Sequence, residues 1–318
     1  MEQEKNISGI SENLSESITD QKPEKVNQKS LFDGMRIAIS VSASEEIEKL
    51  GLSDQHLDDV SIEIARYLIV NGATLLYGGD FKKGFTDLFS TLAYQYKYLN
   101  DKVPRFENYI HFLNVSNVSN TDKADLLSKQ VVAKYLDVPE HLKDIKTHEI
   151  TDPRNNLFDR YITGESLSLM RIKMANESDA RIILGGRLKG FTGYFPGIVE
   201  ETYHTLNANK PVYLLGGFGG ASKAIIEIIL GNSPLELTNE FQFDTPFLKE
   251  FRNYCNEKSS VKPDYEGLCN FFKKYSVELI SKQNGLTIEE NKILFESTNI
   301  HELVFLIIKG LQNLKVKR

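Results

Sequence analysis

The stretch ARIILGGRLKGFTGYFPGIVEE (residues 180–201) begins as an apolar run, turns at two glycines and ends in an acidic segment with helical spacing. A short apolar run that stops at glycine predicts a buried strand, and helical spacing after a loop predicts a helix. Glycine lets backbone N–H groups approach phosphate oxygens closely. The stretch therefore predicts a strand, an anion-binding loop and a helix, in that order.

Two further apolar runs end in glycines, namely LLYGGD (75–80) and YLLGGFGG (213–220). From residue 35 onward such runs alternate with helical segments, which predicts an α/β, Rossmann-like, doubly wound and mainly parallel sheet. Ligands of such sheets bind outside the carboxyl ends of the strands. Glycine at a strand-to-helix turn also has a purely steric use. The repetition of the glycine turn is what favours nucleotide binding.

The expected elements follow from these periodicities. A long helix ends near residue 177 and leads into the strand at 180–186. The other predicted strands are 35–42, 73–80, 108–115 and 210–220, and the other predicted helices are 57–72, 84–99, 121–136, 197–208 and 221–231.

Three regions are expected along the chain. Residues 1–32 are polar and almost free of aromatic side chains, so we predict a disordered tail. Residues 33–233 form the nucleotide-binding domain. Pro234 marks a boundary, and residues 234–318 carry amphipathic runs that predict a carboxyl-terminal helical region.

Composition excludes several classes of protein. The net charge of -6 and the pI near 5.7 lack the basic excess that nucleic-acid binding needs. No apolar run reaches the roughly 18 residues of a membrane span, and no secretory leader is visible, so we expect a cytoplasmic protein. Cys255 and Cys269 are expected to be free thiols. Neither they nor the histidines have metal-ligand spacing, so no metal and no cofactor are predicted.

Two segments resemble the glycine signatures of a known family. LLYGGDFKKGFTDLF (75–89) is similar to the first signature of the LOG proteins, once described as lysine decarboxylases. MRIKMANESDARIILGG (170–186) together with PGIVEE (196–201) is similar to their second signature. The resemblance covers residues 35–232 and places the chain in the wider SLOG superfamily of Rossmann-like nucleotide-binding domains.

LOG enzymes are phosphoribohydrolases, which cleave the N-glycosidic bond of a nucleotide. The resemblance places their phosphate-binding glycines on Gly185, Gly186 and Gly197, and their acidic pair on Glu200 and Glu201. A carboxylate beside the ribose would stabilise the oxocarbenium-like transition state or position a water. The alternative is that both glutamates are first-turn helix acids favoured by the helix dipole.

The catalytic arginine of LOG enzymes aligns less directly. It falls on Met170, and the neighbouring lysine falls on Arg171. Either Arg171 serves the arginine's role one position displaced, or this chain lacks that role. The resemblance thus implies Glu200, Glu201 and Arg171 as the catalytic residues of a nucleotide N-glycosidase.

An insertion, RLKGFTGYFP (187–196), stands where the LOG motif has about one residue. In this respect the chain resembles the SLOG subgroup found beside TIR and other bacterial defence domains, where the fold is thought to sense or process NAD-derived nucleotides. Arg187 and Lys189 could clamp two phosphates, and the loop's aromatic residues Phe191, Tyr194 and Phe195 could cover an adenine face. The alternatives are exposed charges and aromatic anchors of the loop.

Further ligand-binding candidates lie at the predicted strand ends and before the long helix. Ser40 is a candidate phosphate contact at the first strand, and Arg154 is another in TDPRNN (151–156). Asp80 could contact a ribose hydroxyl, although aspartate is common in turns. The glycine turns contribute Gly78, Gly79, Gly84, Gly216, Gly217 and Gly219.

Two functions remain open from the sequence. One is an enzyme that hydrolyses an adenine nucleotide or an NAD-derived nucleotide at its N-glycosidic bond. The other is a non-catalytic sensor of an ADP-ribose-like nucleotide in a bacterial defence or stress system, which passes the signal to an effector protein. The LOG resemblance implies a homo-oligomer, and the small-molecule nucleotide is the partner expected in either case.

Overall fold

The centre of the fold is a six-stranded sheet with the order β4-β3-β2-β1-β5-β6, in which each pair of neighbours is parallel. The computed structural model describes residues 30–79, 84–96, 103–258 and 263–316. The strands are β1 (Arg36–Ser42), β2 (Thr74–Gly78), β3 (Phe106–Ile110), β4 (Val132–Tyr135), β5 (Ala180–Gly185) and β6 (Val212–Leu215). β1 and β5 are buried along most of their length, as expected where helices cover both faces of a sheet.

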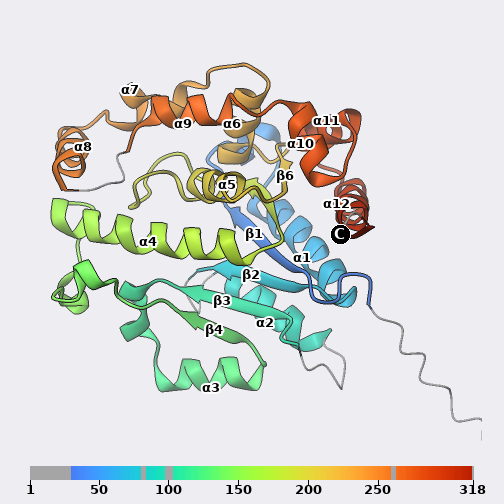
Figure 1. Ribbon diagram of the computed structural model, residues 1–318, viewed down its shortest axis with the longest axis horizontal. Helices are drawn as coiled ribbons and strands as arrows, with labels where there is room; N and C mark the ends of the chain where they lie inside the picture. The colour runs from blue at the N-terminus through green and yellow to red at the C-terminus, as the bar shows by residue number, and fades with distance from the viewer. Residues whose placement is uncertain (1–29, 80–83, 97–102, 259–262, 317–318) are drawn as a thin grey trace, which may run out of the picture. The chain divides into compact units, whose positions relative to one another are not determined.

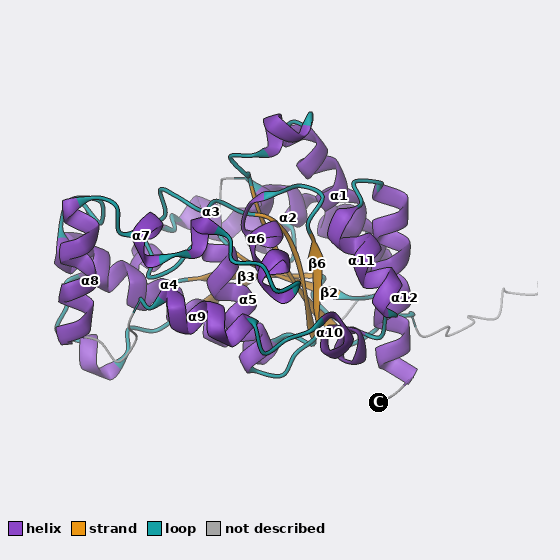
Figure 2. Cartoon of the chain, turned by 90° about the horizontal axis from the view of Figure 1, so that it is seen from above, coloured by secondary structure: helices purple, strands orange, loops and turns teal. Residues whose placement is uncertain are grey.

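Helices cover the two faces of this sheet. In Figure 1, α4 and α5 lie in front of the strands, whereas α1 and α2 lie behind them; Figure 2 shows the same separation from above. The bounds are α1 (Asp54–Val70), α2 (Phe85–Gln95), α3 (Asn120–Ser128), α4 (Leu157–Glu177), α5 (Gly197–Asn207) and α6 (Gly220–Ile229). This arrangement confirms the predicted doubly wound α/β fold.

The chain after Pro234 is helical, as predicted, and packs on the sheet domain. It forms α7 (Asn239–Gln242), α8 (Pro246–Lys258), α9 (Tyr265–Phe272), α10 (Val277–Asn284), α11 (Ile288–Glu296) and α12 (Ile300–Val316). The Tyr213 hydroxyl of β6 donates to the Asn284 carbonyl at 2.8 Å, and Gly216 N donates to the Leu294 carbonyl at 3.3 Å. The helices α10 and α11 therefore cover the outer edge of β6, and their apolar residues share one core with the sheet.

Two predicted elements differ from the structure. The strand expected at 108–115 ends at Ile110, because Phe112 and Leu113 turn into a 3-10 helix that packs on Leu142 and Ile162. The helix expected at 121–136 is wrong in its second half. The chain leaves α3 through Gln130, whose φ of 57° cannot continue a helix, and Val132–Tyr135 then pairs with β3 as the edge strand.

The order of strands places the topological switch between β1 and β5, which pair from Ile37↔Ala180 to Ser42↔Gly185. The carboxyl ends of the strands point to the left-hand side of Figure 1, and the amino-terminal half of α4 and all of α8 lie on the same side. A ligand site of this fold is expected at this edge.

Candidate functional site

Packing of α4 against α5 brings together the three residues predicted to be catalytic. Arg171 Nη1 lies 2.5 Å from Glu200 Oε2, and Arg171 Nε lies 3.7 Å from Glu201 Oε1. All three side chains are buried or nearly so, with exposed fractions of 9%, 2% and 14% for Arg171, Glu200 and Glu201. Arg171, one position from the aligned place, therefore faces both carboxylates.

Each carboxylate has further partners inside the protein. Ser168 donates a hydrogen bond to Glu200, and Ser40 donates one to Glu201. Arg181, fully buried in β5, donates to Glu201 Oε2 at 2.9 Å and to Ser40 Oγ at 2.8 Å. We call these six residues the ionic cluster: Ser40, Ser168, Arg171, Arg181, Glu200 and Glu201. The buried charges pair within this cluster, whereas Arg171 Nε and Arg181 Nη2 have no hydrogen-bond partner.

Arg181 was not singled out in the sequence, although it is a charged residue inside the otherwise apolar run ARIILGG. A charge in a buried strand requires a paired partner in the fold. That rule could have identified Arg181 as a partner of one of the two glutamates.

The ionic cluster makes stability depend on acidic pH. Burial alone would raise the pKa of Glu200, but the Arg171 guanidinium and bonds from His204 and Ser168 hold that pKa below its ordinary value. A lowered pKa in the folded state stabilises the fold above the unfolded pKa of about 4.3 and is lost as pH falls through the folded value. We expect the Tm to fall below about pH 4.3, and to fall less steeply in Glu200→Gln. Calorimetric melts from pH 7 to pH 3 test this; equal slopes would contradict it.

The inserted loop closes over Arg171. A Cβ added at Gly197, the first residue of α5, would lie 3.0 Å from Arg171 Nη2, and one at Gly193 would lie 3.2 Å from Arg171 Nη1. Glycine at these two positions lets the backbone approach the guanidinium. The guanidinium of Arg171 is thus in close contact with the backbone at the end of the inserted loop and at the start of α5.

The turn after β5 is held by backbone contacts. Gly185 has a φ of +64°, and a Cβ there would lie 2.5 Å from the Ser42 carbonyl oxygen. Gly186 N donates to that same carbonyl at 2.9 Å, and Gly186 O accepts from Ala221 N at 2.9 Å. Gly219 precedes α6, where Gly220 N donates to the Glu46 carboxylate at 3.2 Å. These glycines pack β1, β5 and α6 closely together.

The third glycine turn lies beneath the carboxyl-terminal segment. A Cβ at Gly216 would lie 2.3 Å from the Phe295 carbonyl oxygen, and one at Gly217 would lie 2.3 Å from that of Ser297. Contact with the chain's own backbone is enough to explain glycine at both positions.

We expect Gly217→Ala to lower the free energy of unfolding by about 1–3 kcal/mol, because backbone atoms cannot move aside for a methyl group. Gly231→Ala does not serve as a control, because Gly231 has a positive φ of +94° and alanine would strain the backbone there. Chemical denaturation of Gly217→Ala beside the wild type measures the difference. A change within about 0.5 kcal/mol, the range of ordinary surface substitutions, would show that the backbone of residues 296–297 can shift to accommodate the methyl group.

The first glycine turn lies at the carboxyl end of β2. Gly78 packs on Met170 and Met174 of α4, and Gly79 accepts a hydrogen bond from Asn108 Nδ2 at 3.3 Å. Gly84 is exposed at the start of α2. Asp80, predicted to contact ribose, lies outside the described residues.

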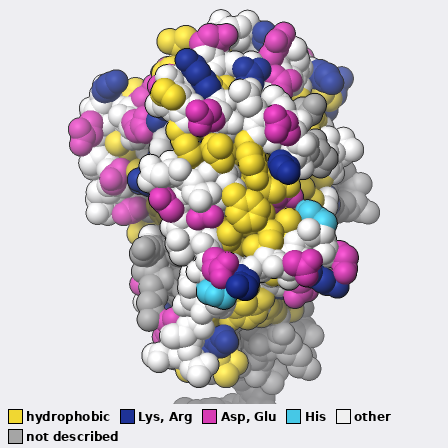
Figure 3. All heavy atoms as spheres, turned by 90° about the vertical axis from the view of Figure 1, so that its left-hand side faces the viewer, with side chains coloured by type: hydrophobic (Ala, Val, Ile, Leu, Met, Phe, Trp, Pro, Cys, Tyr) yellow, Lys and Arg dark blue, Asp and Glu magenta, His cyan; other side chains and the backbone are white. Residues whose placement is uncertain are grey.

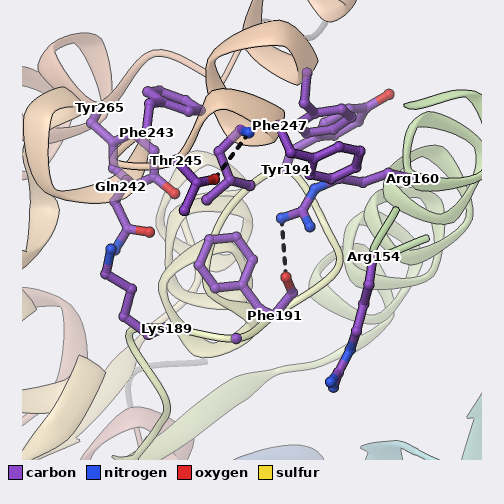
Figure 4. A pocket seen from close by; sticks show the side chains of 13 residues that line it. Arg154, Arg160, Lys189, Phe191, Tyr194, Gln242, Phe243, Thr245, Phe247 and Tyr265 are labelled. Carbon is purple, nitrogen blue, oxygen red and sulfur yellow. Dashed lines mark hydrogen bonds between the residues drawn. The ribbon is translucent and has the colours of Figure 1, made fainter. Parts of the chain in front are cut away.

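A cavity of about 380 Å³ opens beside the inserted loop. Its walls come from the start of α4, the inserted loop and the segment from α7 to α9, and Figure 4 shows the side chains that line it. The lining residues are Arg154, Arg160, Lys189, Gly190, Phe191, Tyr194, Gln242, Phe243, Thr245, Phe247, Leu248, Phe251 and Tyr265. Figure 3 faces the carboxyl edge and shows hydrophobic side chains gathered at its middle with charged ones around them.

Arg160 is the most deeply buried cation of this cavity, with an exposed fraction of 6%. Its Nη2 donates to the Phe191 carbonyl at 3.0 Å, and its guanidinium lies 4.8 Å from the ring centre of Phe251. Its Nε has no hydrogen-bond partner, and no carboxylate in the described ranges pairs with it. Burial lowers the pKa of Arg160. Arg160 was not among the residues predicted from the sequence.

The amino-terminal cap of α4 fixes the place of Arg160. Asn156 accepts hydrogen bonds from Phe158 N at 2.9 Å and Asp159 N at 3.1 Å. Asp159 in turn accepts from Asp152 N at 2.8 Å, which holds the preceding turn. Capping of this kind starts the helix at Leu157, so that Arg160 enters the cavity from its first turn.

The three ligand-binding cations that were predicted from the sequence have different surroundings. Lys189 donates to the Asp244 carboxylate at 2.7 Å and to the Phe241 carbonyl. Arg154 lines the cavity and is exposed; in Figure 4 its side chain extends away from the other side chains that line the cavity. Arg187 is exposed and does not line this cavity. The structure therefore brings Arg154 and Lys189 to one cavity, which none of the six residues of the ionic cluster lines.

Two features are absent from the part of the chain that the structure describes. They hold no group of histidine, cysteine and acidic side chains arranged to bind a metal ion. None of their helices combines the length and apolar character that a bilayer crossing requires.

Comparison with known proteins gives one result for the whole fold. No curated protein matches this chain significantly. A family model described as SLOG cluster2 matches residues 31–294. The match extends past residue 232, where the motif resemblance ended, and includes the helices α7 to α10 and most of α11. Membership of a SLOG family indicates a Rossmann-like nucleotide-binding protein. The chain belongs to the SLOG cluster2 family.

Proposed function

We propose that this protein binds an adenine or NAD-derived nucleotide in the cavity beside the inserted loop and acts as a sensor that leaves the ligand intact. The observation that carries the proposal is Arg160, a guanidinium with an exposed fraction of 6% that lines the cavity and pairs with no described carboxylate. The cavity adjoins the family's glycine loop, at the edge of the sheet where ligands of this fold bind.

The charge of Arg160 favours an anionic ligand. A buried cation without a counter-ion is costly, and an arginine stays protonated even when its pKa is lowered. A phosphate group would accept charge-assisted hydrogen bonds from the guanidinium, including its unpartnered Nε. The exposed Arg154 at the rim adds positive charge along the approach.

The aromatic walls suit a nucleobase. Phe191 and Phe247 line the cavity and are only partly buried, so their rings offer faces on which a base can stack. Such stacking tolerates different bases, as in proteins that bind single-stranded nucleic acids. The volume of about 380 Å³ lies at the small end of ligand sites, which range from about 300 to 1,000 Å³. It suits one nucleoside unit with its phosphates.

The ionic cluster favours a sensor over an enzyme. Both Glu200 and Glu201 are engaged by cations and hydroxyls, and neither lines the cavity. A general base needs a free oxygen within reach of the proton it takes. The second candidate remains N-glycosidic hydrolysis, because Arg171 faces both glutamates as the LOG resemblance implies.

One experiment addresses both candidates. The 318-residue chain is titrated by calorimetry with AMP, ADP, NAD and ADP-ribose, and the mixtures are then separated by chromatography. Binding with full recovery of the ligand supports the sensor. No binding by any of the four would contradict the proposal.

Free base in the chromatogram would favour the hydrolase instead. In that case we expect Glu201→Gln to lower turnover by about 100-fold or more, as for loss of a general acid–base group. Turnover retained by Glu201→Gln would remove Glu201 from any catalytic role. Because Glu201 bonds to Arg181, the Tm of the variant is measured alongside.

A further inference from the structure

Lys189 and Asp244 form an ion pair across one side of the cavity, which we call the clasp. Lys189 Nζ donates to Asp244 Oδ2 at 2.7 Å and lies 4.1 Å from the ring centre of Phe241. Lys189 belongs to the inserted loop, whereas Asp244 lies between α7 and α8. The clasp therefore joins the loop to the carboxyl-terminal helices.

The clasp is a weak pair that another anion can displace. The side chains of Lys189 and Asp244 have exposed fractions of 28% and 51%, so water screens their attraction. Exposed pairs of this kind contribute about 0.2–1 kcal/mol. A phosphate group carries more negative charge than a carboxylate and has three acceptor oxygens. It would compete effectively with Asp244 for Lys189.

The cavity is thus lined by a buried cation, Arg160, and a partly exposed one, Lys189. Arg160 pairs with no described carboxylate, whereas Lys189 is held by Asp244. Figure 4 shows Arg160 bonded to Phe191, whereas the side chain of Lys189 runs towards Gln242 on the other side of the cavity. A ligand with one phosphate can be neutralised at Arg160 alone. A second phosphate at Lys189 competes with Asp244 for the charge of the ammonium group.

We propose that the cavity selects nucleotides that carry two phosphate groups over those that carry one, and that Asp244 sets the degree of selection by competing with the second phosphate for Lys189. This inference rests on the proposed function, which places one phosphate at Arg160. Displacement of Asp244 removes one of the contacts between the inserted loop and the segment from α7 to α8, while the bond from Gln242 Nε2 to the Leu188 carbonyl keeps the two together. Occupancy by the second phosphate is thereby linked to the carboxyl-terminal helices.

The test compares the dissociation constants of AMP, ADP and adenosine 3′,5′-bisphosphate at one ionic strength. Variants of the 318-residue chain are Asp244→Asn, Lys189→Met and, as a matched control, Glu250→Gln. Glu250 is an exposed acid of α8, and its removal changes the net charge without touching the clasp. Calorimetric melts establish that each variant is folded.

We expect the ratio of Kd for AMP to Kd for ADP to rise roughly threefold in Asp244→Asn, within the range set by exposed ion pairs. The ratio is expected to fall towards one in Lys189→Met and to stay at the wild-type value in Glu250→Gln. The bisphosphate separates the two arrangements of phosphate. If it gains from Asp244→Asn and ADP does not, Lys189 receives a phosphate distant from the first.

Failure of the proposed function and failure of the inference about the clasp give different results. If the wild type binds neither AMP nor ADP, the proposed function itself is contradicted. If it binds both but Asp244→Asn leaves the preference of every diphosphorylated ligand unchanged, the inference about the clasp is overturned and nucleotide binding stands. An equal gain in Glu250→Gln would likewise overturn it, since the effect would then come from net charge.

Discussion

Arg160→Met is expected to weaken nucleotide binding by about 30-fold or more, the equivalent of the 2–5 kcal/mol that loss of one partner of a buried charge pair typically costs. The physical reason is that the bound phosphate would lose its deepest cation, whose exposed fraction is 6%. Calorimetric titration with the best ligand of the wild type measures the loss.

The same substitution is expected to leave the fold as stable as before, or to stabilise it by roughly 1 kcal/mol, because methionine removes a buried charge and keeps the length of the side chain. This outcome would separate a ligand-binding residue from a structural one. Arg66→Met is the control, since Arg66 belongs to α1 and does not line the cavity. Large unfolding of Arg160→Met with unchanged affinity per folded molecule would show that Arg160 serves the fold.

Arg171→Met, in contrast, is expected to lower the stability of the fold strongly. Removing Arg171 leaves Glu200 buried, with an exposed fraction of 2%, and without its closest cation. Breaking a buried pair in this way costs about 3–5 kcal/mol of folding free energy. Denaturant titration measures the loss, and the exposed pair Lys143–Glu140 supplies a control in Lys143→Met, expected to change stability by less than about 1 kcal/mol.

The double variant Arg171→Met with Glu200→Leu completes a thermodynamic cycle. Because the second change removes the stranded charge, we expect the double variant to recover a large part of the loss. Equal losses in the single and double variants would show that packing against Gly193 and Gly197 matters more than the ion pair.

Local patterns were sufficient for most of the fold. Buried runs such as 36–42 and 180–185 ended where glycine or serine stopped them, and helical spacing gave the end of α4 and both ends of α5 nearly to the residue. The segment from 120 to 136 failed because a helix and an edge strand follow one another without a glycine or proline between them. The left-handed turn at Gln130 and the pairing of β4 with β3 depend on neighbours that local periodicity does not contain.

The candidate site likewise contains residues that the sequence could indicate and residues that it could not. The resemblance to the LOG signatures implied Glu200, Glu201 and Arg171, because such signatures are short stretches of sequence. Arg160 carried no such signal, since a helical arginine looks like a surface residue until α8 covers it. Gly216 and Gly217 read as ligand-binding turns, whereas the backbone that contacts them comes from residues 295–297.

The sequence by itself determined the parallel α/β fold, its glycine turns and its family, because these follow from periodicity and short motifs within single elements. Only the tertiary structure decided which glycines face the chain's own backbone, that the two glutamates are neutralised by Arg171 and Arg181, and that Arg160 lies in an aromatic cavity. Burial and charge pairing join elements far apart in the sequence, so they exist only once α4, α5 and the carboxyl-terminal helices have packed on the sheet.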